Sequence, residues 1–239
     1  MNETYEECRA RIFGAGQDQK VSAGFFERHV AIVNSESGAL GIRTPEIKRL
    51  AKSVPIACRE GVLDGFFNSG DNVFEAVQFA GMLAARKGDY AATREYLKRL
   101  IPLFGSWAHP DTIVPWLKWT DVDTFLGDFA YLLNCDGQYE VRTYIIYLMT
   151  RCLWDDRIDF TLDTLKNKVG YGQYYVDMAA AWCLSDALVK QYDKTLPLIE
   201  NKTFPPFVHN KAIQKARESF RISAERKQYL NGLKIDKNR

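Results

Sequence analysis

The sequence predicts an all-α protein in which helical hairpins stack on one another, and three observations support that fold class. Apolar residues recur with the 3.6-residue period of a helix, and nowhere do apolar and polar residues alternate strictly for the length of a strand. Only eight prolines and sixteen glycines occur, and they are not gathered into a linker. The connections are short and polar, so consecutive helices should pack as antiparallel neighbours. We therefore predict a single domain over residues 1–239.

Helix entry signals support several of the predicted segments. Thr44-Pro45-Glu46 supplies a hydroxyl cap, a proline at the first helical position and an acid in the first turn. Three other residues occupy similar entry positions: Asp71, Asp156 and Ser223. The predicted helices span residues 3–13, 18–34, 45–53, 72–87, 89–104, 111–118, 121–134, 138–153, 158–168, 173–190, 194–201, 207–219 and 223–234.

Five related segments recur at about the length of one helical hairpin. They begin at Val73, Trp107, Val141, Val176 and Val208, so that successive starts lie 34, 34, 35 and 32 residues apart. A degenerate period of this length is typical of HEAT-like or armadillo-like repeats, in which each helix pair buries a face against the next. This predicts a right-handed α-solenoid whose inner helices share one concave wall. An irregular helical bundle is the alternative.

Composition excludes whole-chain disorder and argues against a membrane protein. With 46% hydrophobic and 26% charged residues, the chain falls in the range of soluble globular proteins. No apolar run approaches the roughly 18 to 20 residues of a membrane span, and the first seven residues carry acids where a secretory signal would carry bases. We therefore predict a cytoplasmic protein.

Neither a metal nor a cofactor is expected. The cysteines are odd in number and form no C-x-x-C pair, so we interpret them as small apolar residues: Cys8, Cys58, Cys135, Cys152 and Cys183. The histidines lie far apart without carboxylate neighbours at ligand spacing: His29, His109 and His209. The signatures of phosphate-binding loops, dinucleotide-binding turns, nucleophile elbows and H-E-x-x-H metalloproteases are absent from the sequence.

The net charge of +2 is unevenly distributed. From residue 211 to residue 239, nine Lys or Arg stand against three acids, which gives +6 in 29 residues and leaves −4 for the first 210. Such a skew suits a polyanionic partner, but a solvated helix would have the same composition, and charge alone leaves both interpretations open.

Four residues on successive repeats suggest a site. Trp107 and Asp111 are four apart and should share a helix face, Arg142 follows on the next repeat, and Trp182 on the one after. A carboxylate beside an indole can stabilise a cation, and an arginine can clamp a phosphate, so the set describes a pocket for a sugar-phosphate that becomes positively charged. The structural alternatives are core tryptophans, a helix cap at Asp111 and a solvated Arg142.

At repeat spacing, several segments resemble the AlkD-like DNA alkylation repair proteins, which are HEAT-like repeat DNA glycosylases. Gly41–Leu50, with the sequence GIRTPEIKRL, is similar to the family's G-[IV]-R-x-P-x-[IL]-R-x-L segment, and Trp107-x-x-x-Asp111 is similar to its W-D-x-V-D motif. Val141-Arg142 matches the arginine that opens the next inner helix, and Met178–Trp182 matches the stretch ending in A-x-x-W. Asn210–Lys215 fits the last repeat.

The resemblance implies base excision repair: hydrolysis of the N-glycosidic bond of cationic alkylpurines, 3-methyladenine and 7-methylguanine, in duplex DNA without rotation of the base into a pocket. Asp111 would stabilise the oxocarbenium-like sugar, Trp107 and Trp182 would lie against the deoxyribose, and Arg142 would hold the phosphate. A monomer that binds alkylated double-stranded DNA is expected. The residues expected to contact DNA phosphates are Arg43, Lys48, Lys211, Lys215, Arg217 and Arg221.

Departures from the family pattern keep two other functions open. Ala108-His109-Pro110 replaces the usual polar and aliphatic residues. The position of Asp177 lies near a basic residue in active relatives but is acidic here, and Ser185 stands where a basic residue is often found. A catalytically silent DNA-binding scaffold is one alternative. A protein–protein adaptor is the other, because HEAT arrays commonly bind helices or peptides and the chain is rich in aromatic residues such as Tyr174.

Overall fold

A computed structural model describes residues 3–18, 23–154 and 156–236. Within these ranges the protein contains fourteen α-helices, short 3-10 turns and no strand, so the prediction of an all-α protein is confirmed. The chain divides into two compact units, Met1–Thr120 and Asp121–Arg239. The single domain and the right-handed solenoid remain predictions.

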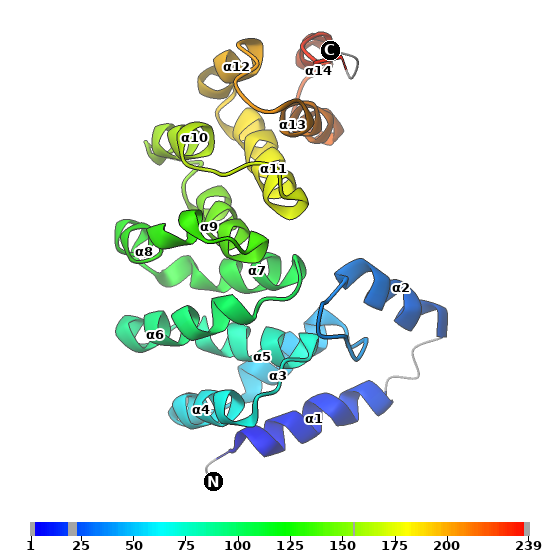
Figure 1. Cartoon of the computed structure of the whole chain (residues 1–239), viewed down its shortest axis with the longest axis vertical. Coiled ribbons are helices and arrows are strands. Elements are labelled where there is room, and N and C mark those ends of the chain that lie inside the picture. Colours follow the sequence, from blue (N-terminus) through cyan, green and yellow to red (C-terminus); the bar gives the residue numbers. More distant parts are fainter. Residues whose placement is uncertain (1–2, 19–22, 155, 237–239) are drawn as a thin grey trace. The chain divides into compact units, whose positions relative to one another are not determined.

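The first unit is built around α5, which is buried along its whole length. It packs against α3, α4, α6 and α7, while α1 packs against α3 and α4. Figure 1 shows α4 and α6 on one side of this unit and α3, α5 and α7 along the other. The helices are α1 (Tyr5–Asp18), α2 (Ala23–Val33), α3 (Thr44–Ser53), α4 (Arg59–Ser69), α5 (Phe74–Ala84), α6 (Tyr90–Leu100) and α7 (Ala108–Ile113). The 3-10 turns are η1 (Ile56–Cys58), η2 (Ile101–Leu103) and η3 (Val114–Trp119).

The second unit is built around α9 and α11. α9 packs against α10 and α11, α11 packs against α12 and α13, and α13 packs against α14. Figure 1 shows α8, α10 and α12 on one side of this unit and α9, α11 and α13 on the other. The elements are α8 (Val122–Asp128), η4 (Ala130–Asn134), α9 (Gln138–Arg151), α10 (Arg157–Asn167), α11 (Tyr174–Lys190), α12 (Tyr192–Glu200), α13 (Pro206–Glu218) and α14 (Ala224–Gly232).

Most predicted helices are present with shifted ends, but the prediction missed α4. Its sequence contains Gly61 and Gly65, which lower helix propensity and hide the apolar period. A Cβ at Gly65 would lie 2.7 Å from the Cβ of Tyr5, so this glycine allows α1 to pack closely on α4. Residues 19–22 of the predicted segment 18–34 lie outside the described residues.

Two predicted helices are interrupted near prolines. The segment 89–104 ends as an α-helix at Leu100, and Pro102 lies in the 3-10 turn that follows. Likewise α7 gives way to η3, which contains Pro115. A proline within a helix removes one amide donor and crowds the preceding turn, which favours the tighter 3-10 geometry at these points.

The predicted capping residues have mixed outcomes. Ser223 caps α14, because its hydroxyl accepts a hydrogen bond from the amide of Arg226. Thr44 does not cap α3: the helix already includes Thr44, and its N-cap is Arg43. The N-cap prediction for Thr44 was therefore wrong by one residue.

The cysteines behave as the sequence predicts for apolar residues. All five are free thiols, four of them buried, and Cys135 is partly buried. In the part of the chain that the structure describes, no helix is both long enough and apolar enough to cross a membrane.

Candidate nucleic-acid interface

The start of α7 carries two of the predicted catalytic residues. Trp107 is the N-cap of α7 and Asp111 lies in its first turn, and both side chains are partly exposed. The indole N–H of Trp107 donates a hydrogen bond of 2.8 Å to the carbonyl of Ile32, at the end of α2. Its ring also packs beside the buried cluster that contains Phe74 and Ala108. These contacts hold Trp107 in a defined position. Because the N-cap of α7 is Trp107, the alternative that Asp111 is a helix N-cap is wrong.

The residues between Trp107 and Asp111 face the core. Ala108, His109 and Pro110 are all buried. His109 stacks on Phe74 with ring centroids 4.6 Å apart, and its Nε2–H donates to the Phe74 carbonyl at 3.0 Å. Burial lowers the pKa of His109 to about 4, so the ring is neutral at pH 7. Ala108, His109 and Pro110 thus contribute to the core beneath α7.

The loop before α3, which carries Arg43, is held by hydrogen bonds to a buried carboxylate. Glu75 is fully buried and accepts hydrogen bonds from the amides of Leu40 and Ile42, at 2.8 and 3.1 Å. Gly41 has a φ of +78°, a conformation that favours glycine. Arg43 itself is exposed.

Arg142 is buried within the second unit. This residue of α9 is only 4% exposed. Its Nη1 donates a hydrogen bond of 2.9 Å to the carbonyl of Tyr175. This bond ties α9 to the first turn of α11. Nearby, the carboxylate of Asp177 accepts a hydrogen bond from the amide of Gly172 at 3.0 Å, so this acid orders the loop that precedes α11.

One hollow in the second unit brings together three residues that were predicted for the site. We call it the Trp182 hollow; it has a volume of about 260 Å³ and is lined by Trp182, Lys215 and Arg221, among others. The ammonium of Lys215 lies 5.7 Å from the centroid of a Trp182 ring. Ser185 and Lys190 also line the hollow, together with the acids Asp186 and Glu218.

The other predicted DNA-contacting cations of this unit make separate contacts. Lys211 donates to Gln214 at 3.2 Å and lines a different hollow, beside Phe207. Arg217 donates to the side chain of Asn231 at 2.6 Å. The structure therefore groups Lys215 and Arg221 with Trp182 but does not place Lys211 or Arg217 in that hollow.

A second basic pocket, in the first unit, contains Lys48 and several residues that the sequence analysis missed. We call it the lysine pocket; it has a volume of about 680 Å³ and lies where α3, the end of α5, α7 and η3 meet. Its cations are Lys48, Lys52, Arg86, Lys87 and Lys118, and its aromatic residues are Trp116 and Trp119. The signal present in the sequence was the spacing of Lys48 and Lys52, one helical turn apart, and the pair of tryptophans around Lys118.

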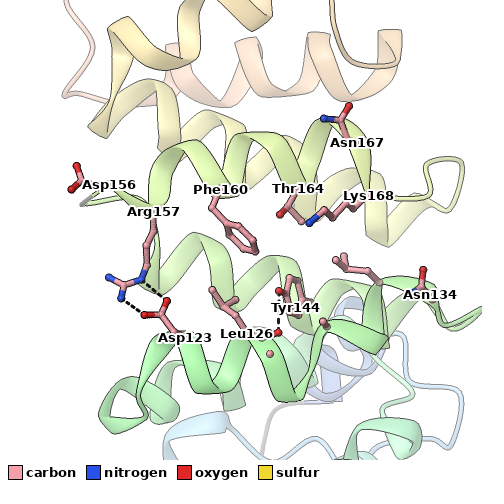
Figure 2. A pocket seen from close by; sticks show the side chains of 13 residues that line it. Asp123, Leu126, Asn134, Tyr144, Asp156, Arg157, Phe160, Thr164, Asn167 and Lys168 are labelled. Atoms are coloured by element: carbon pink, nitrogen blue, oxygen red, sulfur yellow. Dashed lines mark hydrogen bonds and ion pairs between the residues drawn. The ribbon is translucent and has the colours of Figure 1, made fainter.

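A larger, mainly apolar groove lies in the second unit between α10 and the α8–η4 segment (Figure 2). Its volume is about 1040 Å³, and Figure 2 shows Phe160, Leu126 and Tyr144 reaching into it. The Tyr144 hydroxyl donates to the Leu126 carbonyl at 3.3 Å. At one rim Arg157 forms an ion pair of 2.8 Å with Asp123. This groove contains none of the predicted site residues.

The four predicted catalytic residues are divided between the units: Trp107 and Asp111 belong to the first, Arg142 and Trp182 to the second. Their convergence on one nucleotide stays a prediction. Among the described residues, no group of three or more His, Cys, Asp or Glu side chains is arranged to hold a metal ion. No family model, curated protein or solved structure matches the chain.

Proposed function

We propose that the protein is a DNA alkylation repair glycosylase that releases cationic alkylpurines, 3-methyladenine and 7-methylguanine, from duplex DNA. The observation that carries the proposal is the Trp182 hollow, in which an indole shares one surface with the cations Lys215 and Arg221. A nucleotide presents the matching chemistry, because its sugar ring can lie on an indole while its phosphate binds a lysine or arginine.

Asp111 is the residue proposed to lower the reaction barrier. A purine alkylated at N3 or N7 is already cationic and leaves readily, so the rate depends mainly on stabilising the oxocarbenium-like sugar that remains. A carboxylate supplies the opposite charge. The partly exposed position of Asp111 in the first turn of α7, close in sequence to the anchored Trp107, supports this role.

The proposal includes an arrangement of both units in a right-handed α-solenoid of HEAT-like repeats. In that arrangement α7, α9 and α11 would line one concave face and present Trp107, Asp111, Arg142 and Trp182 to the same nucleotide. A crystal structure of the protein on duplex DNA tests this requirement. We further propose a cytoplasmic monomer that works without a metal or cofactor, because charge stabilisation of the sugar needs neither.

The direct test is the release of free base from a duplex that contains 7-methylguanine. We expect release by the unchanged protein, and we expect Asp111→Asn to slow it about 100-fold, the typical loss when one electrostatic stabiliser is removed. Binding to the duplex, measured by fluorescence anisotropy, should be retained. The matched control is Asp193→Asn, which removes a carboxylate that is 94% exposed and lies on α12. Equal rates for Asp111→Asn and the unchanged protein would contradict the role of Asp111.

A catalytically silent DNA-binding scaffold is the second candidate, and the burial of Arg142 favours it. A guanidinium that already donates to the Tyr175 carbonyl is occupied in part with holding two helices together. Duplex binding without base release by the unchanged protein would support the scaffold. Absence of both would leave the adaptor function, for which the apolar groove is the suitable surface.

A further inference from the structure

The lysine pocket concentrates positive charge without an acid. Five basic residues line it, three from α3 and η3 and two from the turn that follows α5, and no Asp or Glu is among its described lining residues. Confining like charges raises the local potential, and a site of this kind attracts anions. The pocket is therefore a candidate for a ligand that carries several negative charges.

The lysines of the pocket are not neutralised by neighbours, unlike other cations of the same unit. Arg49 pairs with Glu46, Arg94 with Glu95 and Arg99 with Asp64. By contrast, no ion pair joins Lys48, Lys52, Lys87 or Lys118 to an acid in the described parts of the chain. Lys48 and Lys52 instead lie over the ring of Trp116, with their ammonium groups 5.7 and 5.9 Å from its centroid. An indole face steers an ammonium without cancelling its charge.

The walls of the pocket are held rigidly by bonds to the backbone. Arg86 donates to the carbonyls of Ala51 and Val54, at 3.0 and 2.6 Å, and so joins the turn after α5 to the end of α3. The indole N–H of Trp119 donates to the carbonyl of Ala85 at 3.0 Å. These bonds hold Arg86 and Trp119 in place before any ligand arrives, which lowers the entropy that these two side chains lose on binding.

A hydroxyl donor lies beside the lysines. Gln78 is fully buried, and its amide donates to the hydroxyls of Thr44 and Thr112, at 3.4 and 3.1 Å. The hydroxyl of Thr112 donates its own proton to the Ala108 carbonyl at 2.6 Å. Within the described residues no acceptor takes the Thr44 proton, so Thr44 can donate to an oxyanion in the pocket. The amide oxygen of Gln78, Oε1, is buried without a partner in the same part of the structure.

From these contacts we infer that the lysine pocket binds backbone phosphates of a DNA strand. Lys48 and Lys52, one turn apart, each meet a phosphate, Thr44 donates to a phosphate oxygen, and the tryptophans offer ring surface to the sugar between them. A space of about 680 Å³ exceeds the needs of a single phosphate group. This inference rests on the proposed function for its choice of DNA, since a free polyphosphate has the same anionic chemistry.

The test is the salt dependence of binding to an unmodified duplex, measured by fluorescence anisotropy. Each phosphate interaction that a variant removes should reduce the slope of log affinity against log salt by about 1, so Lys48→Gln/Lys52→Gln should reduce it by about 2. The matched control is Arg94→Gln/Lys98→Gln on α6, which removes the same charge from residues close to Glu95. An equal slope for the Lys48/Lys52 variant and the control would overturn the inference. The inference would also be overturned if the unchanged protein bound tripolyphosphate at the pocket but did not bind DNA.

Base release separates this inference from the proposed function. A protein that releases 7-methylguanine and keeps its salt slope in Lys48→Gln/Lys52→Gln has the proposed activity but no phosphate site in the pocket. A protein whose slope falls in this variant but that releases no base has the phosphate site and lacks the activity. Circular dichroism of each variant verifies the fold, and Lys48→Arg/Lys52→Arg should keep the slope because the charge remains.

Discussion

Two features occur in both units but in different surroundings: a lysine above a tryptophan ring, and a buried histidine. Each has a lysine over a tryptophan ring at 5.7 Å, Lys48 on Trp116 in the first unit and Lys215 on Trp182 in the second. The two surfaces differ in their acids. The lysine pocket has none among its described lining residues, whereas the Trp182 hollow contains Asp186 and Glu218.

This difference shows that a lysine–tryptophan contact does not by itself define a binding surface. In the Trp182 hollow, Lys190 lies 3.4 Å from Asp186, which offsets part of the positive charge. The potential of a site depends on all charges within about one Debye length, about 8 to 10 Å. The lysine pocket is therefore suited to strong, salt-sensitive attraction of a polyanion, which in the proposed function is DNA. In the same proposal the Trp182 hollow would position a nucleotide that is already bound.

Each unit also contains a buried histidine that donates to a backbone carbonyl: His109 to Phe74 and His209 to Leu233. Burial lowers the pKa of both rings, that of His109 to about 4. In the unfolded chain a histidine ring binds a proton as the pH falls below about 6.5, whereas the buried rings of the folded protein stay neutral to a lower pH. The folded protein therefore loses stability as the pH is lowered from about 6.5 to 4. For His109 the loss over this window is about 3 kcal/mol.

Urea unfolding at pH 7 and at pH 4.5 measures the loss caused by these histidines. We expect His109→Gln to be less stable at pH 7, because it loses the stack on Phe74, but to lose less stability on acidification than the unchanged protein. His209→Gln should show the same direction of change. If His109→Gln and the unchanged protein lose the same stability between the two pH values, His109 is not the group that titrates.

The sequence predicted the helices better than the contacts and pockets that form between helices. The 3.6-residue period identifies most helices because it depends on residues close together in the chain, and it failed at α4, where Gly61 and Gly65 weaken the pattern. Arg142 lies just beyond the first turn of α9, and an arginine is seldom buried unless it is paired, so nothing in the sequence indicated its burial. It follows from packing of α9 against neighbours on both sides.

The candidate site was predicted only where spacing within one helix was enough. Trp107 is the N-cap of α7 and Asp111 lies in its first turn, and that their side chains share one helix face stays a prediction. The lysine pocket joins Thr44, Met82 and Trp119, which are far apart in the chain, so only tertiary packing brings its lining together. The bond from the Gln78 amide to Thr44 and Thr112 likewise crosses 34 residues on either side.

An acid placed in the lysine pocket should make it resemble the Trp182 hollow. Lys118 is exposed at the pocket, and we expect Lys118→Glu to weaken duplex binding about 10-fold at low salt, because it removes one cation and adds one anion beside the phosphates. Fluorescence anisotropy measures the change. The control is Lys98→Glu, an equal charge reversal on α6 of the same unit. Similar losses for both variants would mean that net charge, not the pocket, controls binding.

Removing an acid from the Trp182 hollow should change binding least and in the opposite direction. Glu218 is exposed at the end of α13 and accepts a hydrogen bond of 3.1 Å from Gln214. Since glutamine keeps the size and can still bond to Gln214, Glu218→Gln changes the charge beside Lys215 and Arg221 with little change in packing. We expect duplex affinity to rise about 3-fold at low salt and the gain to disappear at high salt. Asp163→Asn removes an exposed acid of α10 outside the hollow and should leave the affinity unchanged. An unchanged affinity for Glu218→Gln would show that DNA phosphates do not reach this hollow. The Lys48–Trp116 contact would then belong to a DNA-binding surface, and the Lys215–Trp182 contact would not.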